Sequence, residues 1–155
     1  YNKKYNEANN ISSAYLVRDK FSNSYVLESD LYLYNQDLIR KYEYHSNFLG
    51  FKVDRTDDWC LETKNGIITK EKVGGLDCYQ MCGISYYDKE TGKQMEKDIK
   101  EVFMSPGGKE RYWEQVMLDI RKNNYKIYLR ECKSEDIIEI DTFNELKAID
   151  KTYDV

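Results

Sequence analysis

The chain has 155 residues, of which 41% are hydrophobic and 34% are charged, a balance typical of one soluble domain with a proper core. Its net charge is −4 with acidic and basic residues interleaved, which excludes the basic stripe of a nucleic-acid-binding protein. No apolar run is long enough to cross a bilayer, so we expect neither a nucleic-acid nor a membrane partner.

The first half of the chain predicts helices alternating with strands. Asn9 or Asn10 stands where a helix cap is expected, directly before an apolar helical face. The polar segment DRTDD predicts a turn between two strands. The predicted elements are a helix from residue 11, a buried strand at residues 24–34, a helix at residues 36–45, and strands at residues 48–53 and 59–63.

The second half predicts a hairpin, a central strand and two helices before the final strands. Asn65-Gly66 is a strong hairpin signal, and Gly74-Gly75 is expected to end that hairpin. Gly83 would allow a bulge or a close backbone approach within the central strand. The predicted elements are strands at residues 67–73 and 76–87, helices at 89–103 and 111–122, strands at 125–132 and 137–141, and a closing helix.

This order of elements predicts an α/β protein with a largely mixed sheet, formed by residues 1–155 as a single domain. A nucleotide-binding α/β fold normally has a Gly-rich phosphate loop after its first strand. No such loop follows the strand at residues 24–34. Gly107-Gly108 with Lys109 follows no buried strand, so we interpret it as a turn.

Two aspartates stand where predicted strands end. Asp30 ends the run that begins at Ser24, and Asp141 follows the alternating segment IIEI. Because open α/β sheets bind ligands at the carboxyl ends of their strands, these carboxylates could together hold one divalent cation and phosphate oxygens. A structural alternative is also open: Thr142 and Glu145 have the spacing of a capping box, beside which Asp141 would only favour the helix dipole.

Two tryptophans lie among acidic residues. Trp59 follows the DRTDD segment, and Trp113 lies in ERYWEQ. Aromatic faces beside a carboxylate suit a cation without N–H donors, such as a quaternary ammonium, at roughly 0.5–2 kcal/mol per ring. Core packing is the alternative, because Trp113, Met117 and Ile120 have helical spacing. The 15 tyrosines strengthen the expectation of a site that uses ring faces.

The four cysteines allow more than one interpretation. Zinc would need all four thiolates, because the single histidine, His45, lies in a separate segment that is predicted to be helical. We expect reduced and mostly buried thiols in a cytoplasmic protein instead of a zinc site or a disulfide. The cysteines are Cys60, Cys78, Cys82 and Cys132.

Several segments occur together in an order that resembles one enzyme family. They are SNSYVLESDLYLY, the tryptophan after DRTDD, CYQMCGISYYDKETGK, GGKERYWEQV and IIEIDTFNEL. They follow each other as in the bacterial choline-phosphate cytidylyltransferases of the nucleoside-triphosphate transferase superfamily, and the resemblance runs over about residues 5–153. The Tyr-Trp-acid triplet and the Glu-Ile-Asp-Thr ending favour the choline branch.

The resemblance implies a Rossmann-like mixed α/β sheet of the nucleotidyltransferase, glycosyltransferase-A-like type. It implies a cytoplasmic, Mg²⁺-dependent enzyme that transfers a cytidylyl group from CTP to phosphocholine and so supplies choline for decoration of the bacterial surface. Relatives that use 2-aminoethylphosphonate or a sugar 1-phosphate are alternatives, as is a non-catalytic choline-binding module. A homodimer or a fused choline kinase domain is also compatible with the family.

The resemblance also implies roles for individual residues. Asp30 matches the aspartate that binds the catalytic magnesium, and Asp141 matches the second metal ligand. Leu31 departs from the pattern, because many relatives carry asparagine there. The residues expected to surround the choline head group are Trp59, Tyr112, Trp113 and Glu114, and those expected beside the acceptor pocket are Asn10 and Ser13.

Members of this family begin with a basic, Gly-rich loop that grips the triphosphate, and the residues from Tyr1 onward resemble only the part that follows it. The resemblance therefore implies the C-terminal part of a nucleotidyltransferase domain, with a fold that is incomplete at its N-terminus. We expect residues 1–155 alone to be inactive or nearly so.

Overall fold

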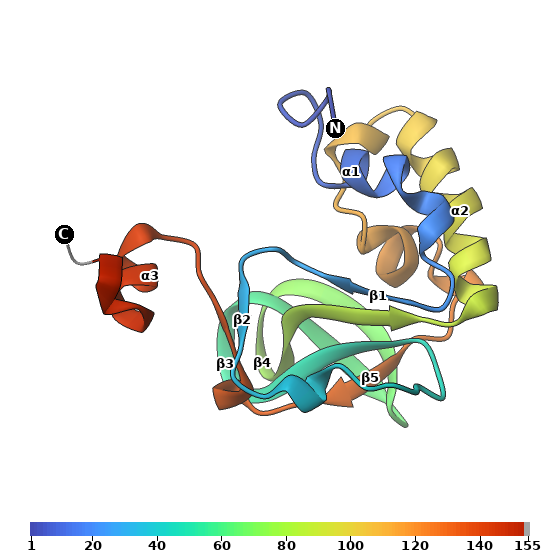
Figure 1. Ribbon diagram of the computed structural model, residues 1–155. Coiled ribbons are helices and arrows are strands. Elements are labelled where there is room, and N and C mark those ends of the chain that lie inside the picture. The colour runs from blue at the N-terminus through green and yellow to red at the C-terminus, as the bar shows by residue number, and fades with distance from the viewer. Residues whose placement is uncertain (154–155) are drawn as a thin grey trace.

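A long antiparallel ribbon organises the computed structural model, which describes residues 1–153 (Figure 1). Its two strands are β3 (Asn47–Lys64) and β4 (Ile67–Tyr87), joined by a tight turn at Asn65-Gly66 as the sequence predicts. The ribbon curls so strongly that Cys60 of β3 lies opposite both Lys72 and Gln80 of β4. A curled ribbon of this length encloses apolar side chains on its concave side.

Two short strands complete this four-stranded sheet, whose order is β1-β4-β3-β5. β1 (Ser24–Leu27) pairs antiparallel with the end of β4. β5 (Tyr128–Glu131) pairs parallel with the start of β3 and also meets Ile67 at the start of β4, so it closes the curl. The α/β fold with a mixed sheet is therefore confirmed.

Helices cover one side of the sheet (Figure 1). α1 (Ile11–Leu16) and α2 (Lys89–Met104) pack against each other, and a short π-helix, Val116–Ile120, packs on β4. The Asp88 carboxylate caps α2 by accepting a hydrogen bond from Thr91 N, at 2.8 Å. Five of the single 3₁₀ turns lie in the connections, at Arg18–Lys20, Gln36–Leu38, Gly108–Glu110, Lys122–Asn124 and Ser134–Asp136.

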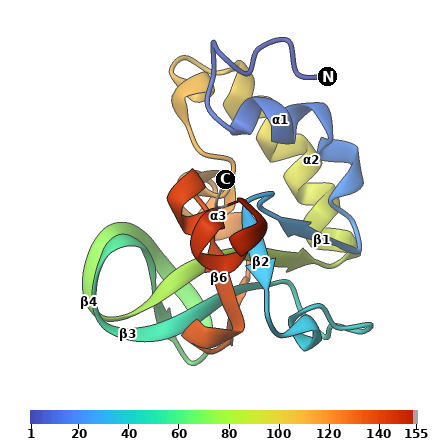
Figure 2. The same cartoon turned by 60° about the vertical axis from the view of Figure 1, so that its left-hand side comes forward.

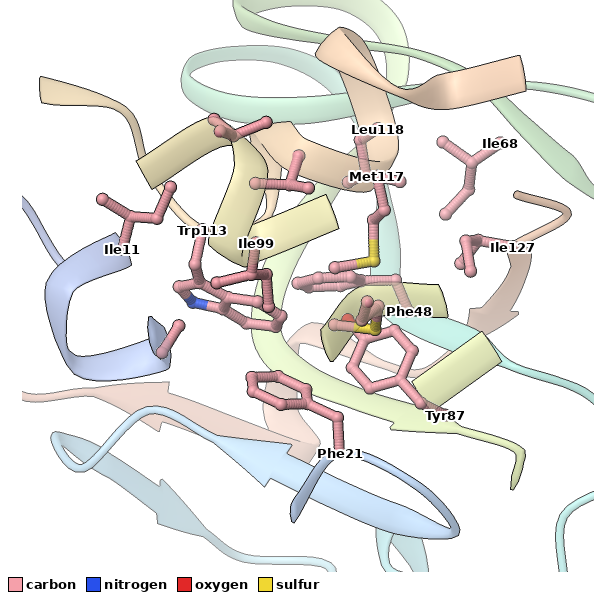
Figure 3. Packing of buried hydrophobic residues seen from close by; sticks show 14 of the residues in the cluster. Ile11, Phe21, Phe48, Ile68, Tyr87, Ile99, Trp113, Met117, Leu118 and Ile127 are labelled. Atoms are coloured by element: carbon pink, nitrogen blue, oxygen red, sulfur yellow. The ribbon is translucent and has the colours of Figure 1, made fainter. Parts of the chain in front are cut away.

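The main core lies between the helical layer and the sheet (Figure 3). Tyr87 and Phe48 from the sheet meet Trp113 and Met117 from the helical side, and all four are buried. Trp113 packs edge-on against Tyr87, with ring centroids 6.0 Å apart and planes at 87°. Aromatic pairs in this geometry contribute about 0.5–1.5 kcal/mol beyond their buried area.

A separate two-stranded sheet carries the last helix (Figure 2). β2 (Leu31–Leu33) pairs antiparallel with β6 (Ile137–Glu139), and α3 (Phe143–Ile149) and a 3₁₀ turn, Lys151–Tyr153, follow. α3 projects away from the rest of the chain and contains no buried residue.

Two predictions for the first half of the chain are wrong. Residues 24–34 form two strands in different sheets, and their side chains are only partly buried. Residues 36–45 form one 3₁₀ turn and no helix, because tertiary contacts hold this segment extended. Its Glu43 carboxylate forms a buried ion pair with Arg130 of β5 and accepts a hydrogen bond from the Tyr25 hydroxyl, at 2.5 Å.

The predicted breaks in the ribbon are also wrong. DRTDD is no turn but a bulged part of β3, and Gly74-Gly75 does not end β4. Gly75 is needed for the curl, because a Cβ there would lie 2.7 Å from each of the Cys60 and Cys78 sulfurs. Only a glycine lets the two layers of the ribbon approach so closely.

The predicted helix at residues 111–122 is a distorted helical segment. Its centre is the π-helix, in which Arg121 N donates to Val116 O at 2.8 Å. The predicted helix at residues 89–103 is confirmed, and the predicted strand at 125–132 is shorter than expected.

All four cysteines are buried free thiols, as the sequence analysis predicted. They form two separate neighbourhoods: Gly75 touches Cys60 and Cys78, whereas the Cys82 and Cys132 sulfurs lie 3.3 Å apart. Among residues 1–153, these cysteines form no group that could hold a metal ion. In the same range, no helix combines the length and apolar character needed to cross a membrane.

Candidate functional site

A pocket of about 610 Å³ opens between α1, the turn after β1, the bulge of β3 and the segment before the π-helix. Seven of the eight residues singled out from the sequence line it, although they come from four separate segments of the chain. These are Asn10, Ser13, Asp30, Trp59, Tyr112, Trp113 and Glu114.

Aromatic rings form one end of the pocket. Trp59 and Tyr112 meet edge to face, with centroids 5.4 Å apart and planes at 65°. Trp113 has only 8% of its surface exposed and packs against Phe21, at 5.5 Å between centroids. Both interpretations of Trp113 therefore apply, because it belongs to the core and also lines the pocket.

Glu114 adds a buried carboxylate beside this aromatic end. The residue is 5% exposed, and its Oε2 atom has no hydrogen-bond partner among the described residues. Burial raises the pKa of Glu114, while Asn10 lowers it to a smaller extent. An unpaired buried acceptor that lines a pocket is available to a ligand carrying positive charge.

Asn10 occupies the N-cap position of α1, one of the two positions that the sequence indicated, but its side chain makes no capping hydrogen bond. Its Oδ1 atom instead accepts a hydrogen bond from Trp113 N, at 2.9 Å. The Ser13 hydroxyl accepts one from the Asn2 amide, at 3.0 Å. The first helix is thereby tied to the segment that carries Trp113 and Glu114.

Carboxylates form the other end of the pocket. Ligand atoms of Glu28, Asp30 and Glu139 lie within 4.8 Å of one another. The pairing of β2 with β6 brings them together: Leu31 lies opposite Glu139, and Ile140 N donates to Asp30 O at 2.8 Å. Three carboxylates at this separation repel one another unless protons or a cation reduce their charge.

Desolvation and mutual repulsion raise the pKa values of two of these groups. The pKa of Glu28 rises to about 7, first because its carboxyl is shielded from water and second through Glu114 and Asp30. Glu28 is exposed as a residue, but its carboxyl lies against Gly83, where an added Cβ would clash with Glu28 Oε2. The pKa of Glu139 also rises to about 7, through desolvation and then through Asp141.

Asp141 does not line the pocket. Its backbone N–H donates to Glu145 Oε2 at 2.9 Å, next to the capping box that Thr142 and Glu145 form as the sequence indicated. Its charge nevertheless raises the pKa values of Glu28 and Glu139, so it lies close to the carboxylate end. Asp141 therefore both adjoins the capping box of α3 and lies near the other carboxylates.

Three acidic residues of the pocket were not singled out as candidates from the sequence: Glu28, Asp58 and Glu139. A signal existed for two of them. Glu28 and Glu139 each precede a candidate aspartate by two positions, and residues two apart in an extended chain face the same side. For Asp58 the signal was incomplete: the acidic segment before Trp59 is plain in the sequence, but which aspartate faces the pocket depends on the bulge.

The carboxylate end has the chemistry of a site for a hard divalent cation. Magnesium and calcium bind carboxylate oxygens, and magnesium usually takes one or two of them together with water and phosphate. The oxygen donors of Glu28, Asp30 and Glu139 fit this requirement.

Comparison with known proteins gives several relatives, although no protein-family model matches the chain. The chain is 26% identical to choline-phosphate cytidylyltransferase of Streptococcus pneumoniae, over 97% of this chain and 66% of that protein. It is 27% identical to 2-aminoethylphosphonate cytidylyltransferase of Lancefieldella rimae, over 98% and 63%. It is also 27% identical to choline-phosphate cytidylyltransferase of Haemophilus influenzae, over 96% and 65%.

Solved structures agree. The CTP:phosphocholine cytidylyltransferase of Streptococcus pneumoniae matches with a TM-score of 0.84 and 25% identity, over 97% of this chain and 66% of that chain. The inositol-1-phosphate CTP transferase of T. maritima, at 14% identity and a TM-score of 0.61, shares the fold. The chain thus has the nucleotidyltransferase fold, its resemblance to choline-phosphate cytidylyltransferases is confirmed, and it spans just under two thirds of these relatives' length.

Proposed function

We propose that this homologue of the choline-phosphate cytidylyltransferases takes part in transferring a cytidylyl group from CTP to phosphocholine. The observation that carries the proposal is a single pocket with aromatic rings at one end and carboxylates at the other. Phosphocholine has the matching polarity, with a trimethylammonium group at one end and a phosphate at the other.

The aromatic end would hold the trimethylammonium group. Trp59, Tyr112 and Trp113 offer ring faces or edges to a cation that has no N–H to donate, and Glu114 supplies the counter-charge. Such contacts are worth about 0.5–2 kcal/mol per ring. Binding energy gained there is available to orient the phosphate at the other end of the acceptor.

The reaction would need no covalent intermediate on the protein. An oxygen of the acceptor phosphate forms a bond to the α-phosphorus of CTP, and the bond from that phosphorus to the β-phosphate oxygen breaks, releasing pyrophosphate. The contribution of this chain is to hold the attacking oxygen in line with the bond that breaks.

Magnesium would be held by Asp30 and Asp141, with Glu28 and Glu139 beside them. When bound, it supplies positive charge that reduces the repulsion between phosphate oxygens. The oxygen donors grouped around Asp30 support its role, and the effect of the Asp141 charge on the pKa values of Glu28 and Glu139 supports placing Asp141 near them.

A second candidate acceptor is 2-aminoethylphosphonate, because a relative named for it is as similar as those named for choline phosphate. Its primary ammonium carries N–H donors, for which the unpaired Glu114 oxygen is a suitable acceptor. The pocket therefore supports a cationic acceptor, and its three aromatic rings favour the quaternary one.

The test uses the full-length reading frame that contains residues 1–155, because the relatives are longer than this chain. Pyrophosphate release would be measured with CTP and magnesium, offering phosphocholine, 2-aminoethylphosphonate and glucose 1-phosphate in parallel. Release with phosphocholine well above the others supports the proposal. Release only with glucose 1-phosphate, or with no acceptor, contradicts it.

A further inference from the structure

Asp58 and Trp59 are neighbours in β3, yet both line the pocket. In a regular strand, consecutive side chains point to opposite faces. The register shows why this rule fails here: Thr56 lies opposite Gly75 and Trp59 lies opposite Val73, so β3 has one residue more than β4 in this interval. Such a bulge re-aims side chains, and here it directs the Asp58 carboxylate toward the same cavity as the Trp59 ring.

A hydrogen-bonded network fixes the Asp58 carboxylate in this direction. Trp59 N donates to Oδ1 at 2.6 Å, and the Gln80 amide donates to Oδ2 at 3.3 Å. Gln80 is itself held, because the Thr56 hydroxyl donates to its carbonyl oxygen at 2.8 Å. The Thr56 hydroxyl also accepts from Asp58 N at 3.0 Å, which closes the network.

The network orients Asp58 without neutralising it. All its partners are uncharged, and within residues 1–153 no lysine or arginine forms an ion pair with Asp58. Asp58 therefore adds to the pocket wall, beside Trp59, a carboxylate that has no ion-pair partner among residues 1–153.

The preceding residue provides a natural contrast. The Asp57 side chain is 90% exposed, does not line the pocket and lies 3.4 Å from the Arg55 guanidinium. Both aspartates are exposed residues, but Asp57 faces solvent beside a guanidinium, whereas Asp58 lines the pocket without an ion-pair partner among residues 1–153.

We propose that Asp58 is a specificity-determining residue that selects acceptors by the positive charge of their head group, and that Gln80 and Thr56 are positioning residues for it. This inference rests on the proposed function and extends it. The aromatic rings and Glu114 hold the cationic head group, and Asp58 adds a second carboxylate that recognises its charge.

The test compares two ligands of the same shape. Phosphocholine and 3,3-dimethylbutyl phosphate differ only in a central atom, which is a positively charged nitrogen in the first and a neutral carbon in the second. Binding of each would be measured by tryptophan fluorescence and calorimetry with the full-length protein, and KM and kcat by pyrophosphate release. The variants are Asp58→Asn, Gln80→Leu, Thr56→Val and, as the matched control, Asp57→Asn.

We expect Asp58→Asn to weaken phosphocholine binding about fivefold and to change binding of the neutral ligand less than about twofold. KM should rise with little change in kcat, because the head group is remote from the reacting phosphate. Gln80→Leu and Thr56→Val should give smaller losses with the same selectivity for the charged ligand. Asp57→Asn should match the unaltered protein with both ligands.

Three different outcomes would overturn the inference. In the first, the unaltered protein binds phosphocholine, and Asp58→Asn binds both ligands with the same affinities as the unaltered protein. The proposed function then stands, but the role of Asp58 does not. Equal losses for both ligands would show that Asp58 only maintains the shape of the pocket. If the unaltered protein binds neither ligand, the proposed function fails and this inference fails with it.

Discussion

The two ends of the pocket are built in opposite ways. The aromatic end is continuous with the main core: Trp113 and Glu114 are both buried, and Trp113 packs on Phe21 and Tyr87. The carboxylate end lies on an exposed turn and a two-stranded sheet, where groups of like charge are held close together. Core packing that the fold needs in any case holds the aromatic end in place. At the carboxylate end, backbone pairing between β2 and β6 holds like charges together despite their electrostatic repulsion.

This contrast predicts that mutations at the carboxylate end reduce activity without reducing stability. Asp30→Ala should lower the turnover of the full-length protein by about 10³-fold or more, because one ligand of the proposed magnesium site is lost. Thermal unfolding should be unchanged or shifted slightly upward, since one repelling charge is removed. Pyrophosphate release and a melting curve measure both, with the exposed Asp54→Ala variant as control. Substantial residual turnover would count against the metal assignment.

The opposite result is expected for the aromatic end where it joins the core. Trp113→Ala should lower the free energy of unfolding by about 3–5 kcal/mol, because a large buried ring leaves a cavity. Trp113→Phe keeps a ring against Phe21 and Tyr87 and should recover about half of the loss. Denaturant unfolding of the three proteins measures this. A loss below about 1 kcal/mol in Trp113→Ala would show that the ring is not part of the core.

Trp59 belongs to the same aromatic end but sits on the bulge of β3, outside the core cluster. Trp59→Ala should therefore weaken phosphocholine binding about tenfold, through the lost cation–π contact. Its melting temperature should stay within about 4 °C of the original, equivalent to about 1 kcal/mol for a domain of this size. A larger drop in melting temperature would show that Trp59, like Trp113, contributes to the packing of the core.

The smallest effect is expected from the carboxyl of Glu71, a residue of β4. Burial, and then the charges of Glu114 and Asp119, raise the pKa of Glu71 to about 8 from its ordinary 4.5. The folded form thus retains a proton that the unfolded form has lost. The stabilisation is complete below about pH 4.5 and is lost as pH rises through about 8.

Glu71→Gln should remove this dependence, because a glutamine stays neutral. We expect its melting temperature to match the original at pH 5 and to exceed it by about 3–6 °C at pH 9, roughly 1–2 kcal/mol. The exposed Glu96→Gln variant is the control and should show no such difference. Equal melting temperatures of Glu71→Gln and the original at both pH values would mean that the Glu71 carboxyl is solvated in solution.

The sequence predicted most of the site but only part of the fold. The residue types at Trp59, Glu114 and Asp30 indicated a cationic ligand and a cation-binding carboxylate, and all three line one pocket. The metal roles of Asp30 and Asp141 remain predictions. Composition and spacing carry such information, because the chemistry of a side chain does not depend on which element holds it.

The errors in the fold arise where long-range contacts override local signals. Residues 36–45 have a helical pattern, but the pairing of Glu43 with Arg130 holds them extended. DRTDD and Gly74-Gly75 look like turns, yet they are the bulge and the bend of one continuous ribbon. Asp58 was missed for the same reason, because a local pattern cannot show a bulge that two distant strands define together.

The short strand β5 has a consequence for the order in which the chain can fold. It occupies the edge of β3 and meets the start of β4, so it seals the curl of the ribbon from a position late in the sequence. The hairpin itself is local and can form early, but the closing contacts join segments far apart in the chain. Folds with such distant pairings form slowly. During synthesis on the ribosome, the pocket would therefore take shape only after most of the chain had emerged.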